Sequence, residues 1–194
     1  MVCRTGNNTT EDNEKEEAEK DMTKRVWEAG QTHWNSKADW ETPPDLFAAL
    51  DAEFHFDIDV CATSENTKCE RYYAPDDDAF FWPWTGTCWM NPPYSRGQIG
   101  RWMQRAFEES QKDGCRVVAL VHARTDTRWF QAYGLRAVEL RFIADRLRFH
   151  HPDMEMTRAA RSPSPSVVII FDYYTGVPPL ARRMFQENGV WHTV

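Results

Sequence analysis

Apolar and polar residues recur with two different periods along the chain, and these periods predict where helices and strands lie. A helical period ends at about residue 54 and follows a Pro43-Pro44 pair that suits a first helical turn. The clearest helical period covers about residues 97–113, and Gly114 is placed to end that helix. Strands are predicted where apolar residues alternate with polar ones or form β-branched runs: 56–62, 71–73, 87–90, 116–122, 138–143 and 166–171.

Two of the predicted helices begin beside residues that can cap them. Thr42 can cap the helix that ends near residue 54, and Thr125 or Asp126 can cap a short helix that runs through Tyr133. A capping side chain supplies an oxygen to backbone N–H groups that have no partner inside the helix.

The order of these elements predicts the class of fold. Strand, helix and strand alternate through the middle of the chain, which favours an α/β fold with a doubly wound, mostly parallel sheet. The apolar run 116–122 is typical of a strand buried on both faces. The run 56–62 alternates with acidic residues, which indicates either a strand with a functional polar side or a solvated edge strand.

Composition divides the chain into three parts. Residues 1–31 are polar and acidic. They contain too few apolar residues to offset the entropic cost of ordering, so we predict that they form a disordered tail. Residues 32–176 hold the predicted elements, and residues 177–194 are set apart as a C-terminal extension. No run of eighteen apolar residues and no signal-peptide pattern is found, so a cytoplasmic protein without membrane contact is expected.

The distribution of charge qualifies the formal net charge of −7. Residues 31–95 carry a net charge of −9, whereas the Arg-rich residues 96–161 carry +5. A basic half can bind a polyanion although the whole chain is acidic. The alternative is that these arginines are scattered over a solvated surface.

The five cysteines form no Cys-x-x-Cys pair, which fits reduced thiols. The spacing of Cys61, Cys69 and Cys88 matches no familiar zinc pattern, and the histidines form no metal-binding or catalytic group. No metal is therefore expected.

The stretch Asn91-Pro92-Pro93-Tyr94 follows an apolar run and is chemically unusual. Two prolines fix the backbone and remove two donors, which leaves rigid acceptors beside an aromatic ring. Such a set can grip a planar, amine-bearing ligand such as an extruded base. The alternative is an ordinary strand exit in which Tyr94 covers the core. Ligands of doubly wound sheets lie at the carboxyl ends of strands, so Asp59 and Asn91 would share one crevice if their strands are neighbours.

An ordered set of motifs spans about residues 33–172. The motifs are Trp40-x-Thr42-Pro43, Phe56-Asp57-Ile58-Asp59-Val60-Cys61-Ala62, Asn66-x-Lys68-Cys69, Asp78-Ala79-Phe80, Trp84, Asn91-Pro92-Pro93-Tyr94, Ala123-Arg124-Thr125-Asp126-Thr127-x-Trp129-Phe130 and Pro165-Ser166.

This set resembles the phage-type DNA N-6-adenine methyltransferases, the Dam-like phage family. The resemblance implies a sheet of the S-adenosylmethionine-dependent methyltransferase (Rossmann-like) type, with residues 32–176 as the methyltransferase domain. It also implies methyl transfer to the exocyclic amine of adenine in duplex DNA, as a phage or prophage DNA modification.

The resemblance assigns roles to two groups of residues. The catalytic group is Asn91, Pro92, Pro93 and Tyr94: Asn91 and the carbonyl of Pro92 would accept hydrogen bonds from the adenine amine, and Tyr94 would stack on the flipped base. The residues assigned to S-adenosylmethionine are Trp40, Thr42, Pro43, Asp59, Cys61, Ala62 and Asp78, with Asp77 as a rival of Asp78 and with Glu65 or Glu70 as guesses for a ribose contact.

Arg124, Thr125 and Asp126 follow the strand 116–122, where they can contact DNA or cap a helix. Arg146 and, more weakly, Arg148 are further candidates for contacts with the DNA backbone. Thr63 stands where the family has a Gly, which keeps open a DNA-binding protein without turnover. Methylation of RNA adenine or of protein glutamine is the other alternative.

Overall fold

The strands of the main sheet come from the whole described length of the chain. The computed structural model describes residues 41–74, 77–93, 98–149 and 160–194, and all of these belong to one unit of the chain, residues 37–194. The predicted tail 1–31, Trp40 and Tyr94 lie outside the described residues.

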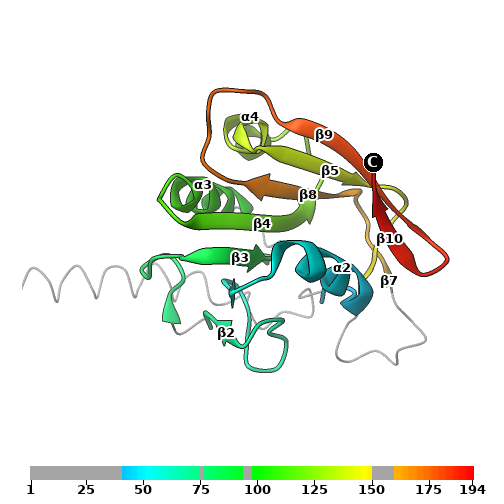
Figure 1. Ribbon diagram of the computed structural model, residues 1–194, viewed down its shortest axis with the longest axis horizontal. Coiled ribbons are helices and arrows are strands. Elements are labelled where there is room, and N and C mark those ends of the chain that lie inside the picture. Colours follow the sequence, from blue (N-terminus) through cyan, green and yellow to red (C-terminus); the bar gives the residue numbers. More distant parts are fainter. Residues whose placement is uncertain (1–40, 75–76, 94–97, 150–159) are drawn as a thin grey trace, which may run out of the picture. The chain divides into compact units, whose positions relative to one another are not determined.

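Within the described residues, the main sheet has eight strands. They are β1 (Ile58–Asp59), β2 (Arg71–Tyr72), β3 (Gly86–Met90), β4 (Cys115–His122), β5 (Glu139–Ile143), β8 (Ser166–Phe171), β9 (Leu180–Glu187) and β10 (Val190–Thr193). Their spatial order is β10-β9-β5-β8-β4-β3-β1-β2 (Figure 1). Strands β6 (Arg148–Phe149) and β7 (Ala160–Arg161) form a separate antiparallel pair.

The sheet is mixed. Strands β2, β1, β3 and β4 are neighbours in that order and are parallel. Strand β8 is antiparallel to both β4 and β5, and β9 is parallel to β5 but antiparallel to β10. The predicted α/β class is therefore confirmed, with a sheet in which β8 and β10 run against the other strands.

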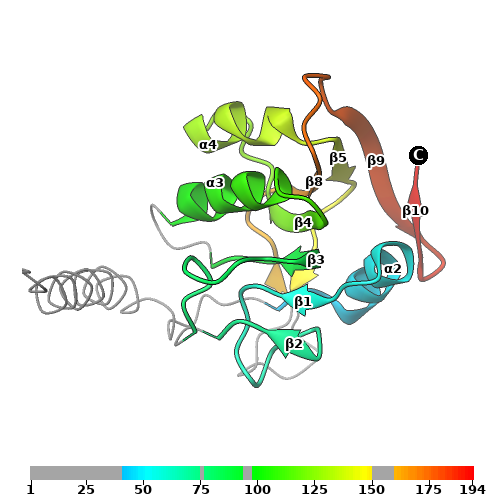
Figure 2. The same ribbon diagram turned by 60° about the vertical axis from the view of Figure 1, so that its left-hand side comes forward.

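Helices lie on both faces of this sheet (Figure 2). Helix α2 (Pro44–Phe54) covers one face, and α3 (Ile99–Ser110) and α4 (Arg128–Ala132) cover the other, followed by the short 3₁₀ helix η2 (Gly134–Arg136). The predicted helical period is confirmed for α3, whose buried side chains include Trp102, Met103, Ala106 and Phe107. On the opposite face, α2 contributes Leu46 and Leu50 to a core cluster that includes Trp89, Val118, Leu120, Val168 and Ile170.

Two predictions about strands need correction. Strand β1 lies between β2 and β3, and Asp59 is only 4% exposed, so the interpretation of a solvated edge strand is wrong. Residues 177–194, set apart as an extension, contain β9 and β10 and are part of the main sheet. The segment between β5 and β8 contains β6 and β7, and its residues 150–159 lie outside the described part of the chain.

The predicted helix caps are also wrong. Pro43 is the N-cap residue of α2, so the helix begins one residue later than a Thr42 cap requires, and no side chain caps it. Thr127 is the N-cap residue of α4, in place of Thr125 or Asp126. Its hydroxyl donates a hydrogen bond to the Arg124 carbonyl, at 2.7 Å, and caps no helical N–H.

Candidate active site

The ends of β1 and β3 meet at the point where the strand order reverses. From β1, the chain passes to β2 on one side of it and then to β3 and β4 on the other side. Asp59 is paired with Trp89 across the parallel strands, and the Val60 N–H donates to the Trp89 carbonyl at 3.0 Å. The two strands are thus neighbours, as the predicted shared site requires. In open α/β sheets this switch point is the usual place for a ligand.

Asp59 is built into the loop that follows β1. One carboxylate oxygen accepts the Cys61 N–H and the other accepts the Lys68 N–H, each at 3.2 Å. Burial raises the pKa of Asp59 to about 6, although both N–H groups and the Lys68 charge oppose this shift. Because both oxygens are already used by backbone groups, Asp59 fixes the shape of the loop from inside.

Lys68 connects this loop to the segment before α2. Its ammonium group lies 3.3 Å from the Glu41 carboxylate, while its backbone N–H bonds Asp59. Thr42, which follows Glu41, is 1% exposed, and its hydroxyl has no hydrogen-bond partner among the described residues. Lys68 and Glu41 therefore hold Thr42 and Pro43 near the end of β1. The sequence placed Lys68 in a motif but gave it no role.

Asn91 continues β3 beyond its last residue and contacts the loop after β1. Burial raises the pKa of the Cys61 thiol, and the Asp59 charge raises it further, whereas the backbone N–H of Asn91 bonds the sulfur and lowers it. Cys61, Ala62 and Pro92 are buried, and Asn91 and Pro93 are half-buried. The strand ends that carry the predicted catalytic and cofactor residues therefore touch each other.

Asp77 and Asp78 occupy a turn beyond β2. The Asp77 carboxylate accepts the Ala74 N–H at 2.8 Å, and the preceding Tyr73 carbonyl accepts the Ala62 N–H at 3.2 Å. Asp78 has a left-handed backbone, with φ at 47°, and its carboxylate accepts the Phe80 N–H within the same turn. By these contacts, Asp77 is tied more directly to the loop after β1 than Asp78.

The two guesses for a ribose contact lie in less favourable places. Glu70 precedes β2 and so lies at the amino end of that strand, away from the carboxyl ends that meet at the switch point. Glu65 is fully exposed on the loop after β1.

The predicted DNA-contacting residues follow β4. Arg124, Thr125 and Asp126 are exposed. Other residues hold the turn through its backbone groups: the Ala123 N–H donates to the Pro165 carbonyl, and the Thr125 carbonyl accepts the Gln131 side chain at 2.6 Å. The side chains therefore project from a turn whose shape does not depend on them.

Arg124 and Arg146 come from different loops but approach the same histidine. Burial lowers the pKa of His122, at the end of β4, and the positive charges of Arg124 and Arg146 lower it further. The His122 ring lies 3.5 Å from the Ser162 hydroxyl. Two arginines that the sequence connected only by composition thus lie on one side of the carboxyl edge of the sheet.

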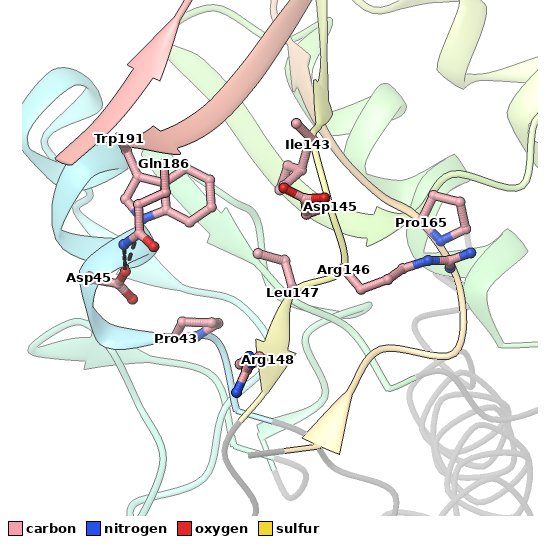
Figure 3. Close-up of a pocket in the computed structure, with 11 residues that line it drawn as sticks. Pro43, Asp45, Ile143, Asp145, Arg146, Leu147, Arg148, Pro165, Gln186 and Trp191 are labelled. Carbon is pink, nitrogen blue, oxygen red and sulfur yellow. Dashed lines mark hydrogen bonds between the residues drawn. The ribbon is translucent and has the colours of Figure 1, made fainter. Parts of the chain in front are cut away.

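Arg146 also lines a pocket of about 850 Å³ (Figure 3). It is lined by Pro43, Asp45, Ile143, Ala144, Asp145, Arg146, Leu147, Arg148, Pro165, Gln186 and Trp191. Pro43 belongs to the predicted cofactor group and Arg146 to the predicted DNA group, so the pocket brings members of both groups together. The C-terminal residues Gln186 and Trp191 carried no signal in the sequence.

The chemistry that this region can support is one of positioning. Burial raises the pKa of Cys61 well above its ordinary value and that of Cys69 to about 12, which disfavours the thiolate that a cysteine nucleophile needs. Asn91 and the Pro92 carbonyl offer hydrogen-bond acceptors at the switch point. Among the described residues, no group of three or more His, Cys, Asp or Glu side chains could hold a metal ion, and no helix is long and apolar enough to cross a membrane.

Comparisons with known proteins give a consistent result. Residues 29–187 match the family model described as DNA N-6-adenine-methyltransferase (Dam). The DNA N-6-adenine-methyltransferase of Escherichia phage T1 is 29% identical over 125 residues, which cover 63% of this chain and 51% of that protein. The putative methyltransferase YfdM of Escherichia coli (strain K12) is 32% identical over 63 residues, which cover 28% of this chain and 69% of that protein. The chain thus spans about half the length of the phage T1 protein.

Proposed function

Since the chain belongs to the DNA N-6-adenine-methyltransferase (Dam) family, we propose that it transfers a methyl group from S-adenosylmethionine to the N6 amine of adenine in duplex DNA. One observation carries the proposal beyond family membership. The backbone N–H of Asn91, after β3, bonds the sulfur of Cys61, after β1. This contact brings the acceptors proposed for the adenine amine next to the loop that Asp59 holds, at the switch point of the sheet.

The topology supports a sheet of the S-adenosylmethionine-dependent methyltransferase type. Strands β2, β1, β3 and β4 are parallel neighbours, and the chain adds β2 on one side of β1, and β3 and β4 on the other side. Antiparallel β8 then lies between β4 and β5. This arrangement brings the carboxyl ends of β1, β3, β4 and β5 to a single edge, where the cofactor and the DNA have to meet.

The residues around β1 fit a bound S-adenosylmethionine, which would supply the methyl group on its sulfonium. Asp59 holds the backbone of Cys61 and Lys68 in place, so this loop needs no ordering when a ligand arrives. The buried Thr42 hydroxyl lacks a partner, and a buried polar group of this kind calls for one. We assign Thr42, Pro43, Asp59, Cys61 and Ala62 to this site, together with Trp40, and prefer Asp77 over Asp78 as the acidic contact.

The Asn91-Pro92-Pro93-Tyr94 stretch would hold the adenine after it flips out of the duplex. Asn91 and the Pro92 carbonyl would accept both hydrogens of the N6 amine and direct the nitrogen lone pair toward the methyl group. The prolines restrict the backbone on both sides of this acceptor pair. Stacking of the base on Tyr94 would add roughly 1–3 kcal/mol. The rate enhancement would come from positioning and from acceptors near the developing positive charge.

The proposal is tested by incubating the protein with methyl-labelled cofactor and unmodified duplex DNA and digesting the DNA to nucleosides. Label in N6-methyldeoxyadenosine is the expected result. Cofactor and DNA binding without transfer would identify a DNA-binding protein that keeps the fold. Label that appears only in added RNA or in protein would select a methyltransferase of another class.

A further inference from the structure

The pocket lined by Arg146 and Trp191, called here the Trp191 pocket, is assembled from segments far apart in the sequence. One wall is the turn after β5, residues 143–148, and another is Pro165 at the entrance to β8. The C-terminal hairpin of β9 and β10 supplies Gln186 and Trp191. Figure 3 shows Trp191 and Gln186 on one side of the pocket and Arg146 beside Pro165 on the other.

The hairpin wall is fixed by Asp45 in the first turn of α2. The Asp45 carboxylate accepts the Gln186 side-chain amide at 2.5 Å and the Trp191 indole N–H at 3.1 Å, contacts drawn as dashed lines in Figure 3. Trp191 is half-buried and packs against the core cluster under α2. The indole is therefore held in place before any ligand binds, which lowers the entropic cost of binding.

The arginine wall is fixed by the turn after β5. Asp145 has a left-handed backbone, with φ at 64°, and the preceding Ala144 N–H donates to the Met184 carbonyl of β9 at 2.7 Å. Leu147 is buried in the core cluster, between the two arginines that line the pocket. The buried leucine anchors the segment, so that Arg146 and Arg148 face the pocket from a fixed backbone.

The charges of the lining residues select a class of ligand. Arg146 and Arg148 are balanced by Asp45 and Asp145, so the pocket has no excess of positive charge to attract an anion by charge alone. A nucleotide meets all the lining groups: its phosphate can bond the arginines, its base can stack on an indole, and its N–H donors can bond a carboxylate.

The pocket shares Pro43 with the proposed cofactor site, whereas its arginines lie toward the DNA side of the sheet. The charge of Arg146 acts on His122 at the end of β4, and pocket residues 143–148 form the end of β5 and the segment that follows it. The proposed cofactor residues Asp59, Cys61 and Ala62 lie at β1, beyond β3 and β4 in the sheet. We propose that the Trp191 pocket binds a nucleotide of the DNA next to the target adenine, an inference that rests on the proposed function. Arg146 and Arg148 would bond the phosphate of this nucleotide, and Trp191 would stack on its base.

The first test measures the affinity of the full chain for a fluorescein-labelled duplex at several salt concentrations. Arg146→Gln and Arg148→Gln should each lower affinity by about tenfold, and each should reduce the slope of log affinity against log salt by about 0.9. Arg116→Gln is the charge-matched control, because Arg116 pairs with Asp172 near the opposite end of β4. It should leave both affinity and slope unchanged.

Trp191 is tested by a pair of variants. Trp191→Leu removes the ring and should lower DNA affinity by about tenfold without changing the salt slope, whereas Trp191→Phe should retain most of the affinity. Since Trp191 also packs against the core, a duplex carrying 5-iodouracil provides a second measurement on the unmodified chain. Irradiation should crosslink the DNA to the peptide that contains Trp191.

The outcomes separate this proposal from the proposed function. DNA affinity and salt slope that stay unchanged in both arginine variants overturn the pocket assignment, as does crosslinking that never reaches Trp191. Loss of S-adenosylmethionine affinity with normal DNA binding also overturns it, because the pocket would then belong to the cofactor. If the variants lose DNA affinity as expected but the parent chain transfers no methyl group, the proposed function fails and the pocket stands.

Discussion

The carboxyl edge of the sheet carries two polar regions that are built in opposite ways. At the end of β1, Asp59 is buried and both of its carboxylate oxygens accept backbone N–H groups. At the end of β4, Arg124 and Asp126 are exposed on a turn whose backbone is held by hydrogen bonds from neighbouring residues, including the Thr127 hydroxyl. The first region is a fixed internal framework, and the second presents charged side chains to solvent.

This difference indicates which kind of ligand each region can bind. A buried loop that hydrogen bonds hold in one conformation can bind a small ligand without the entropic cost of ordering the loop. Exposed arginines keep most of their hydration, so they can attract a large polyanion without the desolvation cost of a buried ion pair. On the proposed function, the cofactor would bind at β1 and the DNA at β4 and β5, with Asn91, just after β3, between them.

The largest expected effect comes from Asn91, where the two regions meet. Asn91→Ala removes the side-chain acceptor for the amine and should lower the transfer rate by about 100-fold or more. Cofactor affinity should stay nearly unchanged, because the backbone N–H that contacts Cys61 remains. Single-turnover transfer and calorimetric cofactor binding measure the two effects.

Asn91→Asp is the matched variant for this test, because it keeps an acceptor oxygen of the same reach and should retain more activity than Asn91→Ala. Equal activity of the parent and the alanine variant would remove Asn91 from the site.

The second effect tests whether the β1 region is a framework for the cofactor. Asp59→Ala leaves the Cys61 and Lys68 N–H groups without their acceptor, and a buried unsatisfied donor costs about 1–3 kcal/mol. We expect cofactor affinity to fall by about tenfold or more, with DNA affinity little changed.

Asp57→Ala is the control for this variant. Asp57 lies two residues earlier and its carboxylate accepts the Thr87 N–H at 2.8 Å, at the opposite end of β3 from Asn91. It should affect stability slightly and cofactor binding not at all. If both variants bind the cofactor equally well, the proposed framework is wrong.

The sequence predicted those parts of this comparison that depend on local patterns. Strand β8 and helix α3 were predicted because their apolar residues are continuous or periodic. The ends of β1 and β3 could be singled out because acidic and proline residues interrupt apolar runs there. Their adjacency was conditional on strand order, which the structure supplies.

Features that depend on distant contacts could not be predicted. Strand β9 is mostly exposed and buries only Met184, so it has no apolar alternation that indicates a strand. Asp45 meets Trp191 across most of the chain, and Lys68 meets Glu41 across a loop. Such pairs follow from the packing of the sheet and leave no local signal, which is why the Trp191 pocket was missed.

The third effect concerns pH and sharpens the description of the β1 region. Burial raises the pKa of Asp59 from 3.8 to about 6, so between about pH 4 and pH 6 the folded chain keeps a proton that the unfolded chain has lost. The stability contributed by Asp59 is therefore full below about pH 4 and falls by about 3 kcal/mol as the pH rises through about 6. This direction is opposite to that of an ion-paired carboxylate.

The measurement compares the free energy of unfolding of the cofactor-free parent with that of Asp59→Asn, which does not titrate, at a series of pH values. The difference between the two proteins should change through this window. A difference that is constant with pH would mean that Asp59 ionises as easily in the folded chain as in the unfolded one.

The smallest effect tests whether the β4 and β5 loops form one basic region. The charges of Arg124 and Arg146 both lower the pKa of His122, in addition to burial. Arg124→Gln and Arg146→Gln should each raise this pKa toward its ordinary value, as measured by NMR titration of the imidazole. Arg136→Gln is the control, because Arg136 packs over Phe107 on the other face of the sheet and should leave the titration unchanged. A response to only one of the two arginine variants would mean that the other arginine lies too far from His122 to belong to one basic region, whereas a response to both would place Arg124 and Arg146 around the same imidazole.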